Sequence, residues 1–271
     1  MTDIHRKIGF IGAGNMASAL IKGIVESGIC RPDTISVSDK SEEALERLSS
    51  RFNVTRSTNR GIVSRCDMVI LAVKPQKTAE VFEELSGSFR EDQILISIAA
   101  GVSISRLRTL AGLDMPIIRV MPNTPALIQM GMSALAGNER VSAQALAAAK
   151  VIFDSVGETL EVEETLMDAV TAVSGSGPGY IFRIMEAMVA AGTSVGLDSD
   201  MSLRLVVQTF LGAARLAKES DKPLSVLRRM VTSPGGTTAA GLSIFDELGL
   251  EQMTQKAITA ARDRSLELGK D

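Results

Sequence analysis

The 271-residue chain has a formal net charge of −3 and no block of basic residues, which argues against a nucleic-acid-binding protein or a polybasic membrane surface. Its length suits one large domain or two ordinary ones. With no Trp, one Tyr and eight Phe, its core must be built from Ala, Val, Ile, Leu and Met.

A few residue types indicate where the protein works and which kinds of site it lacks. Cys30 and Cys66 are isolated, which predicts a reduced cytoplasmic protein without a zinc site. Residues 1–9 contain no signal-peptide core, and Arg183 and Glu186 interrupt the best candidate for a membrane span. The single histidine, His5, belongs to the N-terminal tail, so a mechanism based on a buried catalytic histidine is not expected.

A glycine motif follows the first predicted strand. The apolar residues 7–11 lead directly into Gly12–Ala17 (GAGNMA), a G-x-G-x-x-A motif, and helical spacing continues to Gly28. Gly12 permits a tight turn, Gly14 lets the backbone approach a pyrophosphate, and Ala17 allows the helix to pack closely on the strand. We therefore predict a dinucleotide site here. The alternative is a tight strand–helix turn with no ligand.

The end of the second predicted strand, residues 34–38, bears on the choice of cofactor. An acidic residue at the position of Asp39 normally accepts a hydrogen bond from a ribose 2′-hydroxyl and disfavours the 2′-phosphate of NADP. Ser38, Lys40 and Ser41 belong to the same turn and offer hydrogen-bond donors to that phosphate. These residues alone leave NADH and NADPH open.

Three further apolar runs, residues 67–73, 93–98 and 116–120, are typical of parallel strands that are covered on both faces. They end in the small, proline and amide residues that a nicotinamide pocket needs, although each end alone is also a common turn: Lys74–Gln76, Ala99–Gly101 and Met121–Pro125. A helix over 143–156 and a last strand over 158–162 follow. This alternation predicts an α/β fold, a Rossmann-type doubly wound parallel sheet, for residues 1–162.

From residue 163 onward, helical periodicity replaces the strand-like runs. Helices are predicted over 166–173, 180–195, 201–217 and 224–230, from about 238, and over 250–268. Their apolar faces exceed what about a hundred residues can bury, so we predict an all-α dimerisation domain over 163–271; the alternative is a self-contained bundle. Ser174–Gly179 must break or kink a helix, either as a substrate-facing kink or as a hinge.

The stretch Ser233–Thr238 (SPGGTT) is the most specific in the chain. A proline followed by two glycines predicts a tight turn, and residues 239–242 have the composition of an opening helix. The N–H groups of Gly235 and Gly236, at a positive helix terminus, suit a carboxylate. The alternative is that Thr237 or Thr238 simply caps the helix.

Together with Ala72–Gln76 (AVKPQ), Arg119–Pro125 (RVMPNTP) and Ser174–Pro178 (SGSGP), these motifs make the chain similar to pyrroline-5-carboxylate reductases over nearly its whole length. The resemblance implies hydride transfer from NAD(P)H to the C=N carbon of 1-pyrroline-5-carboxylate, giving L-proline in the last step of proline biosynthesis. It favours NADPH, with NADH as the alternative. It also implies a homodimer, assembled into a decamer, with substrate sites between two protomers.

The resemblance assigns roles by motif. The substrate residues are Gly235, Gly236, Thr237 and Thr238, with Thr238 as the catalytic hydroxyl that reaches the ring nitrogen. The cofactor residues are Gly12, Ala13, Gly14, Asn15, Met16, Ser38, Asn59, Ala72, Val73, Lys74, Pro75 and Ala100. One position departs from the pattern, because many members have an asparagine near the cofactor where this chain has Met230.

Two other functions fit parts of the sequence. A 3-hydroxyacid dehydrogenase shares the glycine turn and the helical domain, but alcohol oxidation needs a general base, commonly a lysine. The lysines of the helical half stand at charged helix ends or near the terminus: Lys218, Lys222, Lys256 and Lys270. A non-catalytic NADP sensor is the other alternative, and it would leave the SPGGTT turn without a role.

Overall fold

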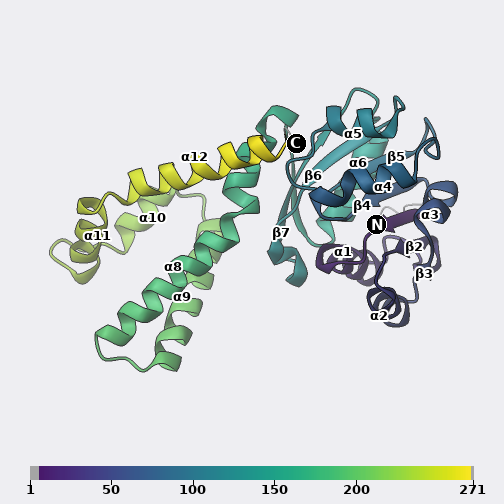
Figure 1. Cartoon of the computed structure of the whole chain (residues 1–271). Coiled ribbons are helices and arrows are strands. Elements are labelled where there is room, and N and C mark those ends of the chain that lie inside the picture. The colour runs from purple at the N-terminus through teal and green to yellow at the C-terminus, as the bar shows by residue number, and fades with distance from the viewer. Residues whose placement is uncertain (1–5, 270–271) are drawn as a thin grey trace. The chain divides into compact units, whose positions relative to one another are not determined.

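The computed structural model describes residues 6–269, so His5 and Lys270 lie outside the described part of the chain (Figure 1). The chain forms two compact units. The first extends to Ser176 and takes in the chain again from Ala261, and the second is Gly177–Ala260. We predicted a division after residue 162. The first unit continues past that point because the next helical segment packs on the sheet through Met167, which is fully buried.

The first unit is built on a sheet that has eight strands among the described residues, in the order β3-β2-β1-β4-β5-β6-β7-β8. The strands are β1 (Ile8–Ile11), β2 (Ile35–Ser38), β3 (Thr55–Arg56), β4 (Met68–Leu71), β5 (Ile94–Ser97), β6 (Ile117–Met121), β7 (Gly131–Gly137) and β8 (Gly157–Glu161). All neighbours pair in parallel except β6 and β7. The strand order reverses at β1 and β4, and ligands of doubly wound sheets bind beyond the carboxyl ends of the strands at such a point. The predicted Rossmann-type fold is confirmed.

Both faces of the sheet are covered, which explains its continuous apolar runs. Along β4, Met68 and Ile70 belong to one core, while Val69 and Leu71 belong to the core on the other face. The first core is completed by α1 (Asn15–Glu26), α2 (Glu42–Phe52) and α6 (Ala143–Asp154). The second is completed by α3 (Asn59–Arg65), α4 (Thr78–Glu84) and α5 (Ile104–Ala111).

Two strands were not predicted from the sequence. β7 has the sequence GMSALAG, which contains none of the β-branched or aromatic residues that favour strands, and it forms because β6 offers it an antiparallel partner. β3 has only two residues, both exposed, so no hydrophobic pattern marks it.

The second unit is helical, as predicted. It contains α8 (Gly177–Ser194), α9 (Ser199–Glu219), α10 (Leu224–Met230), α11 (Thr237–Glu247) and the first part of α12 (Leu250–Leu268). α8 and α9 pack side by side (green in Figure 1), and the Ser202 hydroxyl on α9 donates a 2.9 Å hydrogen bond to the Val189 carbonyl on α8. No helix in residues 6–269 combines the length and apolarity needed to cross a bilayer.

Many large apolar side chains of this unit face outward. The exposed set on α8 and α9 includes Ile181, Phe182, Ile184, Met188, Leu203, Leu205, Val207 and Leu211. Large exposed apolar side chains in this number are typical of an interaction surface. The helical unit therefore has the surface expected of a dimerisation domain.

Candidate active site

The β1–α1 turn combines a tight backbone with an open helix start. Gly12 has φ +107°, and a Cβ there would lie 2.5 Å from the Ala72 carbonyl oxygen, so only glycine fits. Gly14 is different, because it is the N-cap of α1 and a Cβ there would meet nothing within 4 Å. Since protein packing does not require glycine at 14, the open space above it fits a ligand that approaches the backbone. The first N–H groups of α1 lack partners within the helix and suit a pyrophosphate.

The predicted cofactor residues at β4 and β5 are neighbours of this turn. The Ala72 N–H donates to the Ile11 carbonyl at 2.8 Å, and the Ile98 N–H donates to the Leu71 carbonyl at 3.1 Å. These bonds place the ends of β1, β4 and β5 along one edge of the sheet. Lys74 is exposed, and Val73, Pro75 and Ala100 are half-buried beside the same edge. The structure thus brings together the glycine turn, the AVKPQ segment and Ala100.

The end of β2 differs from the sequence prediction in one respect. Ser38 is only 2% exposed, and its hydroxyl donates to Asn59 Oδ1 at 2.7 Å, so it faces Asn59 rather than open space. Asn59 also donates from Nδ2 to Glu84 at 2.7 Å. The sequence could not show this, because Ser38 and Asn59 are 21 residues apart and no local pattern connects them. Ser38 holds Asn59 in place instead of presenting its own hydroxyl.

The charged residues after β2 are already paired. The Asp39 carboxylate accepts hydrogen bonds from the Ala13 N–H at 2.6 Å and the Ser41 N–H at 2.9 Å, which ties the end of β2 to the glycine turn. Lys40 forms an exposed ion pair with Glu80 of α4. Hydrogen bonds from Lys40 and Lys77 lower the pKa of the Glu80 carboxyl to about 2. A 2′-phosphate at this edge would therefore meet Lys40 beside a fully ionised carboxylate.

The SPGGTT segment is a type II turn followed directly by α11. The Gly236 N–H donates to the Ser233 carbonyl at 3.0 Å, with Pro234 at the second position and Gly235 at φ +69° in the third. Gly235 and Gly236 were predicted to bind a carboxylate through their N–H groups. The Gly236 N–H is instead used by the turn itself.

The threonines begin α11 but do not cap it. Gly236 is the N-cap residue, with no side-chain cap, and Thr237 and Thr238 are the first two residues of the helix. The capping alternative is therefore wrong. Both threonines are exposed in the single chain, and their N–H groups lie in the first turn, where an α-helix supplies no partners. The N–H groups of Thr237 and Thr238 are thus available to an anion, and the Gly235 N–H, unlike that of Gly236, has no partner among the described residues either.

A π-helical turn leads into the glycine-rich segment at 174–179. After η4 (Glu164–Leu166) and α7 (Met167–Val170), the turn covers Thr171–Gly175, and the Ser176 N–H donates to the Thr171 carbonyl at 2.8 Å. Asn123, after β6, donates to the Ser174 carbonyl at 3.2 Å. The predicted kink is therefore a π turn fastened to the end of β6, and α8 continues from Gly177.

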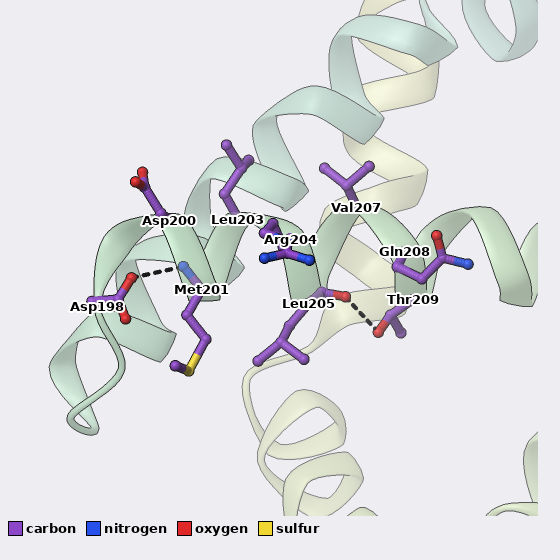
Figure 2. Close-up of a pocket in the computed structure, with 9 residues that line it drawn as sticks. All are labelled: Asp198, Asp200, Met201, Leu203, Arg204, Leu205, Val207, Gln208 and Thr209. Atoms are coloured by element: carbon purple, nitrogen blue, oxygen red, sulfur yellow. Dashed lines mark hydrogen bonds between the residues drawn. The ribbon is translucent and has the colours of Figure 1, made fainter.

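A hollow of about 840 Å³ lies along α9 in the second unit (Figure 2). Asp198 caps this helix by accepting from the Met201 N–H at 2.8 Å, and apolar side chains between the polar ones project outward. Met201, Leu203 and Leu205 are about half exposed. Polar and apolar side chains of α9 and its cap residue line this hollow together, so it is part of the exposed surface of that helix.

Comparison with known proteins gives consistent results for both halves. Residues 164–268 match the family model described as pyrroline-5-carboxylate reductase dimerisation, and residues 7–101 match that described as NADP oxidoreductase, coenzyme F420-dependent. A pyrroline-5-carboxylate reductase of Methanosarcina acetivorans is 40% identical over 98% of this chain and 99% of that protein. The solved structure of a pyrroline-5-carboxylate reductase from Coxiella burnetii has a TM-score of 0.92 at 37% identity, covering 99% of this chain and 100% of the other. A Plasmodium falciparum pyrroline carboxylate reductase with NADP bound has a TM-score of 0.88 at 32% identity, covering 98% and 99%.

Proposed function

Because the chain belongs to the pyrroline-5-carboxylate reductase family and reduces 1-pyrroline-5-carboxylate to L-proline with a nicotinamide cofactor, we propose that the substrate binds at the Ser233–Thr238 turn and the cofactor at the β1–α1 turn. The observation that carries this proposal is the uncapped start of α11 directly after a glycine turn. This helix start provides hydrogen-bond donors for an anion. The threonine hydroxyls do not cap the helix, so they are available to the substrate.

The first unit holds the cofactor. The N–H groups at the start of α1 bind the pyrophosphate over the bare Gly14, and Asn59 is positioned by Ser38 for the adenosine end. Residues 72–75 and Ala100 line the other end along the β4 and β5 edge. The reduced nicotinamide, when bound, supplies the hydride for the imine carbon. The chain itself has to bind, orient and neutralise, which agrees with the absence of any histidine from residues 6–271.

The second unit holds the substrate. The N–H groups of Thr237 and Thr238 donate hydrogen bonds to the substrate carboxylate at the positive end of α11, and Gly235 and Gly236 keep the approach free of side chains. The Thr238 hydroxyl hydrogen-bonds the ring nitrogen and stabilises the amine that forms there. Each role uses an atom that the local structure leaves available.

An assay with matched substrates tests this function. We expect oxidation of NADPH with 1-pyrroline-5-carboxylate, a kcat/KM at least tenfold lower with 1-pyrroline, which lacks the carboxylate, and no reaction between NADP⁺ and 3-hydroxyacids. Equal kcat/KM for the two pyrrolines would contradict the carboxylate site, and turnover of 3-hydroxyacids would favour the dehydrogenase alternative.

The preference for NADPH over NADH is a further part of the proposal. Lys40 is 81% exposed beyond β2, where a 2′-phosphate is expected, while both oxygens of Asp39 already accept backbone N–H groups. We expect Lys40→Ala to lower kcat/KM for NADPH several-fold and to leave that for NADH unchanged. An NADH preference above tenfold in the unmodified enzyme would reverse the assignment.

We also propose a cytoplasmic homodimer that assembles into a decamer. The buried thiols Cys30 and Cys66 suit a reducing compartment, and the exposed apolar faces of α8 and α9 suit a second copy of this chain. Light scattering should give at least a dimer, and a decamer if the larger assembly forms. A folded, active monomer at micromolar concentration would rule out the assembly.

A further inference from the structure

The turn after β5 is contacted directly by the end of the last helix. Gly101 has φ +78°, and a Cβ on it would lie 3.3 Å from Leu268 Cβ and 3.6 Å from the Gly269 nitrogen. In the other direction, a Cβ on Gly269 would lie 2.7 Å from the Gly101 carbonyl oxygen. Two glycines therefore allow the backbone of residues 268–269 to rest on the backbone of residue 101. Ala100, proposed to line the cofactor, is the adjacent residue.

A partly buried polar network connects the end of α12 to α5, which follows that turn. The Ser265 hydroxyl, on a residue that is 4% exposed, donates to Asp168 Oδ1 at 2.6 Å. Arg119, which is 5% exposed, lies between the carboxylates of Asp168 and Glu164. Its Nη2 is 3.5 Å from Asp168 Oδ1, and its Nη1 is 3.4 Å from Glu164 Oε1. Glu164 Oε1 in turn accepts the Ile104 N–H at 2.6 Å, at the first residue of α5.

The turn has little strong bonding of its own. The Ala99 N–H reaches the Ser97 hydroxyl at 3.3 Å, and the Val102 N–H reaches the Ala99 carbonyl at 3.4 Å, both longer than usual for such bonds. Its position is therefore set by its supports, which are Leu268 and Gly269 on one side and the bond from Glu164 to Ile104 on the other. The two short bonds of the network, from the Ser265 hydroxyl to Asp168 and from the Ile104 N–H to Glu164, are both 2.6 Å and lie on either side of Arg119.

We infer that Ser265, Asp168, Arg119 and Glu164 are positioning residues for the cofactor site, because they hold the 99–103 turn, and with it Ala100, at the nicotinamide end. The inference rests on the proposed placement of the nicotinamide beside Ala100. The adenosine end depends on other contacts, since Asn59 is held by Ser38 and Glu84. Loosening the network should therefore weaken binding at one end of the cofactor only.

Titrations of the full-length enzyme with NADPH and with adenosine 2′,5′-bisphosphate test this. We expect Ser265→Ala to weaken NADPH binding about threefold to tenfold and to leave affinity for the adenosine fragment unchanged. Asp168→Ala should weaken NADPH binding more than Ser265→Ala does. Asp168→Asn should weaken it less than Asp168→Ala, because the amide oxygen can still accept the hydrogen bond from Ser265. Ser50→Ala on α2 is the control for loss of a serine hydroxyl that bonds only to carbonyls of its own helix, and it should change neither affinity.

The outcomes separate this inference from the proposed function. Unchanged NADPH affinity in Ser265→Ala, or equal weakening of NADPH and the adenosine fragment, would overturn the positioning role. Ala100→Leu serves as the reference, because a larger side chain beside the nicotinamide should weaken NADPH binding. If that variant binds NADPH normally, the cofactor placement is wrong. If it binds weakly while Ser265→Ala binds normally, only the inference fails.

Discussion

Gly14 and Gly236 are the N-cap residues of α1 and α11, and their backbones are nearly the same, with φ −72° and ψ −175° at Gly14 and φ −81° and ψ 173° at Gly236. Neither has a side chain to cap its helix, so both helices present open N–H groups. The surroundings differ. The β1–α1 turn is packed between strands: Ala13 is 1% exposed and Gly12 lies against Ala72. The Ser233–Thr238 turn is open, because a Cβ on Gly235 would meet nothing within 4 Å.

This difference separates two reasons for glycine. In the β1–α1 turn, packing requires glycine at Gly12, while Gly14 has open space above it, where we propose that the pyrophosphate binds. In the second turn, the backbone conformation of Gly235 requires glycine, while the neighbouring space is open. Substitution of Gly12 should therefore affect the fold, whereas changes at Gly14 and at the start of α11 should affect ligand binding with little change in stability.

The largest effect is expected for Gly12→Ala. The added Cβ would lie 2.5 Å from the Ala72 carbonyl oxygen. The alanine would also have to adopt φ +107°, which is strained for an L-residue. We expect a loss of roughly 2–4 kcal/mol in the free energy of unfolding, measured by denaturant titration. Gly28→Ala, also at positive φ but with nothing within 4 Å, is the control for strain alone. Equal losses in the two variants would show that packing against Ala72 is unimportant.

Gly14→Val should separate ligand binding from folding. Its side chain would enter open space, so the free energy of unfolding should change little, while the pyrophosphate would be pushed away from α1. We expect at least tenfold weaker NADPH binding, about 1.4 kcal/mol, in a fluorescence titration. Normal cofactor affinity in a folded Gly14→Val enzyme would contradict the dinucleotide site.

A smaller loss of ligand binding is expected for Thr237→Pro, which removes one backbone N–H donor at the start of α11. Proline is well tolerated at the first helical position, and the extended backbone of Gly236 is compatible with a following proline. The KM for 1-pyrroline-5-carboxylate should rise about fivefold to tenfold, with melting temperature and NADPH affinity unchanged. Thr237→Ala, which keeps the N–H, is the control. If both variants raise KM equally, the side chain rather than the N–H is responsible.

The sequence predicted the features that depend on local patterns. The Rossmann-type sheet followed from apolar runs such as residues 67–73, and the helical domain followed from the change of periodicity after 162. β7 was not predicted, because its residues favour a strand only when β6 is beside them. The hydrogen bond from Ser38 to Asn59 likewise joins residues 21 positions apart, which no short motif predicts.

The candidate site was predictable in composition but not in hydrogen bonding. The SPGGTT segment predicted a turn at a helix start, yet the sequence could not show that the Gly236 N–H bonds to Ser233, or that the N-cap falls on Gly236 rather than on a threonine. The network around Arg119 joins residues far apart in the chain, from Ile104 to Ser265, so no local signal points to it.

The proposed role of Thr238 is tested most directly by measuring kcat/KM and melting temperature for Thr238→Ala and Thr238→Ser. Because Thr238 does not cap α11, Thr238→Ala should leave the melting temperature and NADPH affinity nearly unchanged. One lost hydrogen bond at the ring nitrogen is worth roughly 1–3 kcal/mol, so kcat/KM should fall about fivefold to a hundredfold, with Thr238→Ser retaining much of the activity. A Thr238→Ala enzyme that is less stable but fully active would contradict the catalytic assignment.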